Sequence, residues 1–274
     1  MKKIIALIAV VTIIASSLTG CMTLSSLPFS FEDYENADQY IGGDREITDR
    51  VENIDLDWSA GKVSLKTYSG DSISLRETIS GNVPDDYRVH SWVDGTTLRI
   101  RFAKSGFKNV LNLGKKELEI LVPEDMELTE LKIHHASGHL DCVGVPAEKL
   151  HIDSASGGVN VESISSEISI GHASGSLDFL QSAEIKSFEL DHSSGGTRLD
   201  FAFVPEKLKV HSASGGLTIK LPEDAGFTLN LDQSTGGFDY ELPIHRYDDT
   251  YVCGDESAQF DIDIATGGLH ILKH

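Results

Sequence analysis

One short signature recurs along this chain and constrains its fold more than any other feature. It reads His or Ser, then Ala or Ser, then Ser-Gly, and several copies carry a second glycine. The copies lie 18 to 21 residues apart, with one gap of 31 residues before the last copy. Self-similarity at such a period is the mark of a repeat architecture. The clear copies end at Gly138, Gly157, Gly175, Gly195 and Gly215, two weaker ones at Gly236 and Gly267, and a divergent early copy at Gly61.

The residues on both sides of each signature alternate between apolar and polar. Leu150 and Ile152 precede the second clear copy, and Val159 and Val161 follow it, and the other copies have the same pattern. A period of two predicts a strand, a glycine-containing bend and a second strand, with one face buried. No stretch between residues 51 and 274 has a helical period of 3.6.

Proline often closes the second strand, where it marks a corner because it cannot donate to a ladder. The segments 118–125 and 217–224 read as the same proline-closed half-repeat, so the repeat begins before residue 131. Burying about four apolar side chains yields roughly 6–12 kcal/mol, whereas ordering about twenty residues costs roughly 30 kcal/mol. One unit therefore cannot fold alone, and neighbouring units must stack.

We therefore expect an all-β fold, a β-solenoid or β-helix-like stack of about 20-residue strand–bend–strand repeats. A β-sandwich of coil-like hairpins is the alternative. Residues 51–130 are predicted to form an N-terminal β-repeat and capping region. Residues 131–274 are predicted to form the Ser-Gly repeat region, with an insertion at 241–259.

The N-terminus carries an export signal. Lys2 and Lys3 precede an apolar run at 4–15, which ends in Leu-Thr-Gly-Cys at 18–21. This sequence resembles a bacterial lipobox, in which the cysteine is lipidated. We predict a lipoprotein signal peptide at 1–20, lipid on Cys21 and a tether at 21–50; an ordinary secretory signal is the alternative.

The net charge limits the partners. Lys and Arg number 23 against 43 Asp and Glu, a formal net charge of −20. Nucleic acid is excluded as a partner because phosphate binding needs clustered cations. Docking on anionic lipid through a basic face is disfavoured for the same reason, so the membrane contact is expected through the lipid on Cys21.

Three histidines have the phase of inward-facing residues. His135, His172 and His192 lie three residues before their glycines, so stacking would place them in one row. Zinc prefers a tetrahedral ligand set, which a row does not supply. We expect a polar ladder in which these histidines bond to the bend serines, and we expect no metal and no cofactor. Calcium at the acidic bends is the lesser alternative. The bend serines of this ladder are Ser137, Ser156, Ser174, Ser194 and Ser214.

The repeated Ser-Gly pairs do not predict a hydrolase. A nucleophile elbow needs a strand-to-helix turn, and an enzyme needs one activated serine instead of many equivalent ones. No catalytic residue is assigned. Cys142 has the phase of a buried residue, and a Cys142–Cys253 disulfide is permitted in an exported protein but is not established by the sequence.

The repeated unit, the proline-closed strand and the lipoprotein start together resemble the bacterial putative-adhesin β-strand-repeat family. The resemblance covers residues 51–274 and implies a β-repeat domain of cell-envelope proteins with unassigned biochemistry. It assigns no functional residue. The chain departs from the family pattern by the 31-residue gap.

We interpret the chain as a non-catalytic cell-envelope lipoprotein that serves adhesion, scaffolding or envelope interaction, with an envelope protein or a glycan as partner. Its place is the cell membrane or outer envelope, lipid-anchored and extracytoplasmic. The alternatives are a glycan-active enzyme on a β-helix scaffold and a regulatory partner of an envelope-stress system. The candidate contact loop lies in the insertion and comprises His245, Arg246, Tyr247, Asp248 and Tyr251.

Overall fold

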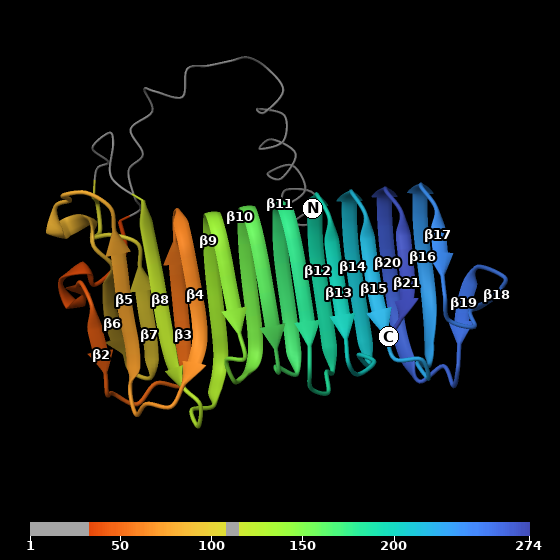
Figure 1. Ribbon diagram of the computed structural model, residues 1–274, viewed down its shortest axis with the longest axis horizontal. Helices are drawn as coiled ribbons and strands as arrows, with labels where there is room; N and C mark the ends of the chain where they lie inside the picture. Colours follow the sequence, from red (N-terminus) through yellow and green to blue (C-terminus); the bar gives the residue numbers. More distant parts are fainter. Residues whose placement is uncertain (1–32, 108–114) are drawn as a thin grey trace, which may run out of the picture.

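The computed structural model describes residues 33–107 and 115–274, which form one elongated stack of β-strands (Figure 1). The predicted β-solenoid is confirmed, because successive repeats pair in parallel instead of forming hairpins. Two short 3-10 helices occur, η1 (Ala37–Gln39) and η2 (Asp85–Tyr87). No helix among the described residues is long and apolar enough to cross a membrane.

The strands fall into an N-terminal group and a repeat group. The first comprises β1 (Ile41–Gly42), β2 (Arg45–Ile47), β3 (Asn53–Trp58), β4 (Gly61–Tyr68), β5 (Ile73–Ile79), β6 (His90–Asp94), β7 (Thr97–Arg101) and β8 (Lys116–Pro123). The second comprises β9 (Leu128–Val143), β10 (Ala147–Ser163), β11 (Glu167–Gln181), β12 (Ser187–Ser194), β13 (Thr197–Phe201), β14 (Lys207–Ser214), β15 (Leu217–Leu221), β16 (Phe227–Thr235), β17 (Phe238–Tyr240), β18 (His245–Tyr247), β19 (Thr250–Cys253), β20 (Ala258–Thr266) and β21 (Leu269–Lys273).

Each repeat contributes one rung that crosses a corner at its glycine. The half before the glycine pairs in a first sheet, which contains β3, β12, β14, β20 and β16. The half after it pairs in a second sheet, which contains β4, β13, β15, β21 and β17. The strands β9, β10 and β11 run through the corner and belong to both sheets.

The corner requires glycine. Gly157 lies over Gly138, and its φ of 116° is left-handed. A Cβ built on Gly157 would lie 1.8 Å from the Gly138 carbonyl oxygen, far inside van der Waals contact. The repeated glycine in the sequence therefore marks the place where neighbouring backbones approach most closely.

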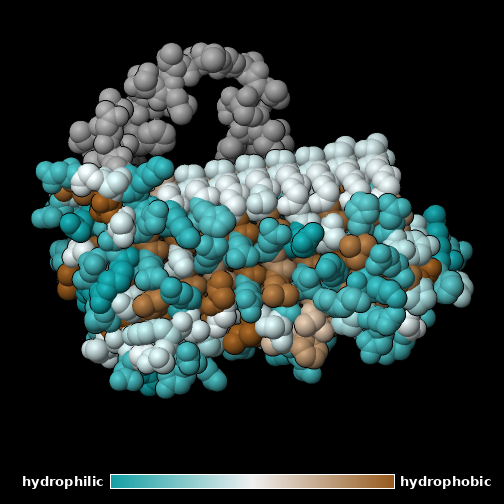
Figure 2. Space-filling view, in the orientation of Figure 1, coloured by the Kyte–Doolittle hydropathy of each residue, from teal (hydrophilic) through white to brown (hydrophobic). Residues whose placement is uncertain are grey.

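The bend hydroxyls hold successive rungs together. The Ser174 hydroxyl donates to the Ala155 carbonyl, and the Ser214 hydroxyl to the Ser193 carbonyl, each on the neighbouring rung. The expectation that these serines bond to the histidines was wrong, because they lie on the outer side of the corner and the histidines point inward. Figure 2 shows the edge along the top of the stack as a flat band of near-neutral hydropathy. The same bond is made by Ser137, Ser156, Ser194, Thr235 and Thr266.

The core fills the space between the two sheets. The alternating apolar residues of the repeats are buried, as their phase predicts. Phe179, Phe188 and Phe201 meet across the two sheets with ring centroids 4.7 to 5.6 Å apart. One continuous apolar core therefore runs along the stack.

Spatial order differs from chain order at both ends. The last rung, β20 and β21, inserts between β14/β15 and β16/β17. The chain thus skips one place to form β16/β17, makes the β18–β19 hairpin, and returns to fill the gap. The 31-residue spacing reflects this path. At the other end β3/β4 lies between β7/β8 and β9 in the same way.

The N-terminal end closes over a buried ion pair. Lys116 occupies the corner position that glycine holds in other rungs, and its Nζ lies 2.9 Å from Glu77 Oε1, with both side chains at most 1% exposed. Nζ also donates to the Tyr87 and Phe102 carbonyls. Burial lowers the pKa of Lys116 to about 8, while Glu77 acts in the opposite direction.

Candidate functional site

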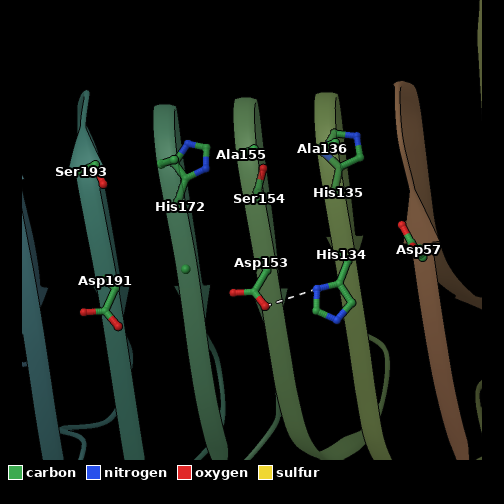
Figure 3. Close-up of a pocket in the computed structure, with 12 residues that line it drawn as sticks. Asp57, His134, His135, Ala136, Asp153, Ser154, Ala155, His172, Asp191 and Ser193 are labelled. Carbon is green, nitrogen blue, oxygen red and sulfur yellow. Dashed lines mark ion pairs between the residues drawn. The ribbon is translucent and has the colours of Figure 1, made fainter. Parts of the chain in front are cut away.

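A shallow groove of about 380 Å³ crosses the outer face of the first sheet below the corner (Figure 3). Its lower wall is one outward-facing row that crosses successive strands at right angles, formed by Asp57, His134, Asp153 and Asp191. Gly171 leaves a notch in the row between Asp153 and Asp191. Small residues of the corner form the upper wall: Ala136, Ala155, Ala173 and Ser193.

Two imidazoles converge on one carboxylate in this groove. The Asp153 Oδ2 atom lies 3.3 Å from His134 Nδ1 and 2.9 Å from His151 Nε2. The three side chains are between a third and a half exposed. No group of three or more His, Cys, Asp or Glu among the described residues is arranged to hold a metal ion. The groove can form hydrogen bonds and attract cations.

The predicted histidine row exists inside the corner. His135, His172 and His192 are buried, and the rings of His172 and His192 stack with centroids 5.5 Å apart and an interplanar angle of 2°. His135 Nε2 lies 3.1 Å from the Gly61 carbonyl, and Thr197 Oγ1 lies 3.0 Å from His192 Nδ1. Burial lowers the pKa of all three imidazoles, so they are neutral at pH 7. The row is part of the core.

The predicted contact residues lie together on the β18–β19 hairpin at the C-terminal end. Tyr247 is 66% exposed, and His245 and Asp248 are also exposed. Arg246 donates from Nε to the Asp248 carbonyl at 2.9 Å and lies over the Tyr251 ring at 5.5 Å. Tyr251 turns back toward the stack, where its ring lies 5.1 Å from that of Phe238.

Two of the three cysteines, Cys142 and Cys253, lie in the part of the chain that the structure describes. Cys142 and Cys253 are both buried and free, so the disulfide that the sequence left open is absent. Burial raises the pKa of the Cys142 thiol to about 12, which makes it unreactive. The predicted lipidation site, Cys21, lies outside the described residues.

Sequence reasoning missed the groove and the buried ion pair. The groove could have been found from the phase of Asp57, Asp153 and Asp191, which each lie four residues before their corner glycine. For Lys116 the sequence holds no signal, because its burial depends on η2 and on Phe102, directly after β7, which pack over the N-terminal end.

The sequence of this solenoid matches a known family model. The family model Toastrack DUF4097 matches twice, over residues 51–201 and 124–267. The chain belongs to the Toastrack DUF4097 family. The two overlapping matches span nearly all of the solenoid, in keeping with its repeats. No curated protein matches the Toastrack chain significantly.

Solved structures similar to this Toastrack chain are remote in sequence. A "putative adhesin" from Bacteroides fragilis NCTC 9343 has 13% identity and a TM-score of 0.43, covering 88% of this chain and 99% of its own. A "putative cell adhesion protein" from Clostridium sporogenes ATCC 15579 has 12% identity and a TM-score of 0.35, covering 85% and 100%. A "putative lipid binding protein" from Parabacteroides distasonis ATCC 8503 has 15% identity and a TM-score of 0.36, covering 89% and 99%.

Proposed function

We propose that this Toastrack protein is a non-catalytic, lipid-anchored protein of the cell envelope that presents a binding surface at the far end of a stiff rod. The observation that carries the proposal is the position of the two ends. The first described residues lie at one end of the stack, and the β18–β19 hairpin lies at the other (Figure 1).

The anchored end is fixed by direct contacts. The Tyr34 backbone N–H donates to Ser105 Oγ at 3.0 Å, its hydroxyl donates to the Ala103 carbonyl at 3.1 Å, and β1 pairs with β6. At about 4.8 Å per strand, roughly 50–60 Å separates this end from the hairpin. A lipid on Cys21 would then hold the hairpin away from the membrane.

The use of the hydroxyl groups supports a role in binding instead of catalysis. The hydroxyl of each bend serine or threonine donates a hydrogen bond to a backbone carbonyl of the neighbouring rung, as Ser156 does to the Ala136 carbonyl at 3.3 Å. Repetition of one structural bond along the stack explains why the residues recur. On the hairpin, by contrast, the exposed side chains of His245 and Tyr247 make no hydrogen bond or ion pair with the described residues.

Membrane attachment is tested by labelling. Cells expressing the wild type or Cys21→Ser are fed radiolabelled palmitate and fractionated. We expect label and membrane association only for the wild type. Equal membrane association without label would overturn the anchor.

The binding surface is tested by cross-linking in cells followed by mass spectrometry. A variant with Arg246→Ala, Tyr247→Ala and Asp249→Ala changes only exposed hairpin side chains. The control carries Arg50→Ala, Asp71→Ala and Asp85→Ala at the opposite end. A partner lost from the hairpin variant and kept by the control supports the proposal. Turnover of a purified polysaccharide by the wild type would favour the enzyme alternative.

A further inference from the structure

The C-terminal end of the solenoid leaves part of its outermost rung unpaired. Among the described strands of the second sheet, β17 pairs only with β21. In the first sheet, β19 covers β16 only from Phe227 to Asn230, so no described strand pairs with residues 231–235 on the outer side. The outer rung is thus open on both sides of its corner.

At the opposite end the outermost parallel rung, β7 and β8, is covered by antiparallel strands. There β6 pairs with all of β7, from Thr97 to Arg101, and β5 pairs with β8 from Lys116 to Leu121. Natural sheets protect such edges against association. The outermost parallel rung is therefore covered at the N-terminal end and left partly open, at β16 and β17, at the C-terminal end.

The direction of the β17 backbone groups follows from its pairing. Leu269 N–H donates to the Gly237 carbonyl, and Glu241 N–H donates to the Ile271 carbonyl, each at 2.9 Å. In a parallel pair of strands, the N–H and C=O groups of one residue point to the same side of the strand, and that side alternates from each residue to the next. Gly237, Asp239 and Glu241 therefore face β21, and Phe238 and Tyr240 direct their N–H and C=O groups outward.

An aromatic surface lies beside this edge. The rings of Phe238 and Tyr240 are 5.1 Å apart, and Phe238 meets Tyr251 edge-on at 5.1 Å. Tyr240 is 46% exposed. A strand added to β17 would cover these rings as well as pair with the backbone, so affinity and side-chain selectivity would come from one contact.

Acidic side chains surround the edge. Asp232, Asp239 and Glu241 lie on the open rung, and Asp248 and Asp249 lie in the neighbouring turn. Among the described residues, the ion-pair partner of Asp239 is a histidine, with His270 Nδ1 at 3.4 Å from Asp239 Oδ2. Two cations lie beside these five carboxylates: Arg246 pairs with Asp249 at 3.7 Å, and Lys273, whose backbone N–H donates to Glu241 Oε2 at 3.3 Å, pairs through Nζ with Glu223 at 2.7 Å. The surface is therefore negative, which disfavours a second copy of this acidic chain and favours a basic partner.

We propose that the open edge, formed by β17 and residues 231–235 of β16, binds an extended basic segment of another protein, which adds to the second sheet as a further strand. This inference rests on the proposed binding role and names its partner class. The unpaired backbone N–H and C=O groups of the edge can form hydrogen bonds with an added strand. The surrounding carboxylates favour lysine or arginine side chains on that strand.

The probe is an alternating lysine–valine octapeptide, titrated calorimetrically into the full mature chain carrying Cys21→Ser. One control peptide replaces lysine with glutamate. A second keeps the lysines and replaces valine with proline, so it retains the charge but cannot form a strand. We expect binding of the first peptide only. We also expect at least tenfold slower amide exchange at Phe238 and Tyr240 when it is bound.

Two substitutions at one position separate pairing from side-chain contact. Tyr240→Pro removes the outward N–H, whereas Tyr240→Ser keeps it and removes the same ring. We expect at least tenfold weaker peptide binding for Tyr240→Pro than for Tyr240→Ser, with circular dichroism confirming that both fold. If Tyr240→Pro does not fold, amide exchange in the wild type decides.

Equal binding of the proline-containing peptide would overturn the inference, because charge alone would then explain the contact. Binding of no peptide, or dimerisation through this edge, would also overturn it. Either result leaves the proposed function intact if the cross-linked partner still depends on the hairpin, so the two failures are distinguishable.

Discussion

Gly195 lies over Gly175 at the corner, and a Cβ on Gly195 would approach the Gly175 carbonyl oxygen to 1.9 Å. Gly195 also has a φ of 128°. Its neighbour Gly196 has neither constraint, because nothing lies within 4 Å of the place where its Cβ would be. Two adjacent glycines of one signature therefore have different physical roles.

Gly195→Ala is expected to destabilise the solenoid by about 2–4 kcal/mol, because it combines a backbone clash with a left-handed conformation. Gly196→Ala is the matched control and should change stability by less than about 1 kcal/mol. The measurement is urea unfolding followed by circular dichroism. Equal effects of the two substitutions would show that close backbone contact is not the reason for the glycine.

Each hydroxyl hydrogen bond between rungs should contribute a small and additive amount to the free energy of unfolding. Ser174→Ala removes the bond to the Ala155 carbonyl, which lies near the surface where water replaces part of it. We expect a loss of about 0.5–1 kcal/mol. The combined variant Ser156→Ala, Ser174→Ala and Ser194→Ala should lose about the sum, since each bond links a different pair of rungs. Ser182→Ala, at an exposed turn, is the control for serine loss.

The sequence predicted the repeat and the phase of its residues because both follow from one alternating pattern. The inward positions of Ile152, Val161 and His172 all come from counting residues to the glycine. The order of the end rungs could not be predicted in this way. β16 and β20 carry equivalent patterns, and only packing at the open end decides which lies outside. Ser174 shows a second limit, since the pattern gives its position but not its acceptor.

Acid should destabilise the solenoid through the buried histidine row. Burial lowers the pKa of His135, His172 and His192 in the folded state, whereas an unfolded histidine titrates near pH 6.5. The unfolded chain therefore binds more protons, and stability falls as the pH drops below about 6.5. The stacked rings of His172 and His192 also repel when both are charged.

The pH effect is measured as the urea midpoint at pH 7.5 and pH 5. The variant His172→Ser with His192→Ser copies residues that occupy the same row elsewhere, Ser154 and Ser212. We expect it to lose less stability between the two pH values than the wild type. His245→Ser, on the exposed hairpin, is the control for loss of a histidine outside the row. An unchanged dependence in the double variant would assign the acid effect to other groups.

Lys116→Met should be the most damaging single change at the N-terminal end. It leaves the Glu77 carboxylate buried without its cation, although this carboxylate still accepts the Val89 N–H at 2.9 Å. Breaking a buried ion pair on one side typically costs about 3–5 kcal/mol. Adding Glu77→Gln removes the uncompensated charge and keeps an acceptor for Val89, so the double variant should recover part of the loss.

An exposed pair provides the control. Lys66 and Glu119 lie 2.7 Å apart, with both side chains more than 40% exposed. Lys66→Met should cost less than about 1 kcal/mol, because water screens the partner that remains. All variants are compared by urea unfolding at pH 7. If Lys116→Met and its double variant were equally unstable, the loss would come from the contacts of Lys116 with the Tyr87 and Phe102 carbonyls instead of from the stranded carboxylate. Recovery in the double variant assigns the stability of this end to the Lys116–Glu77 charge pair.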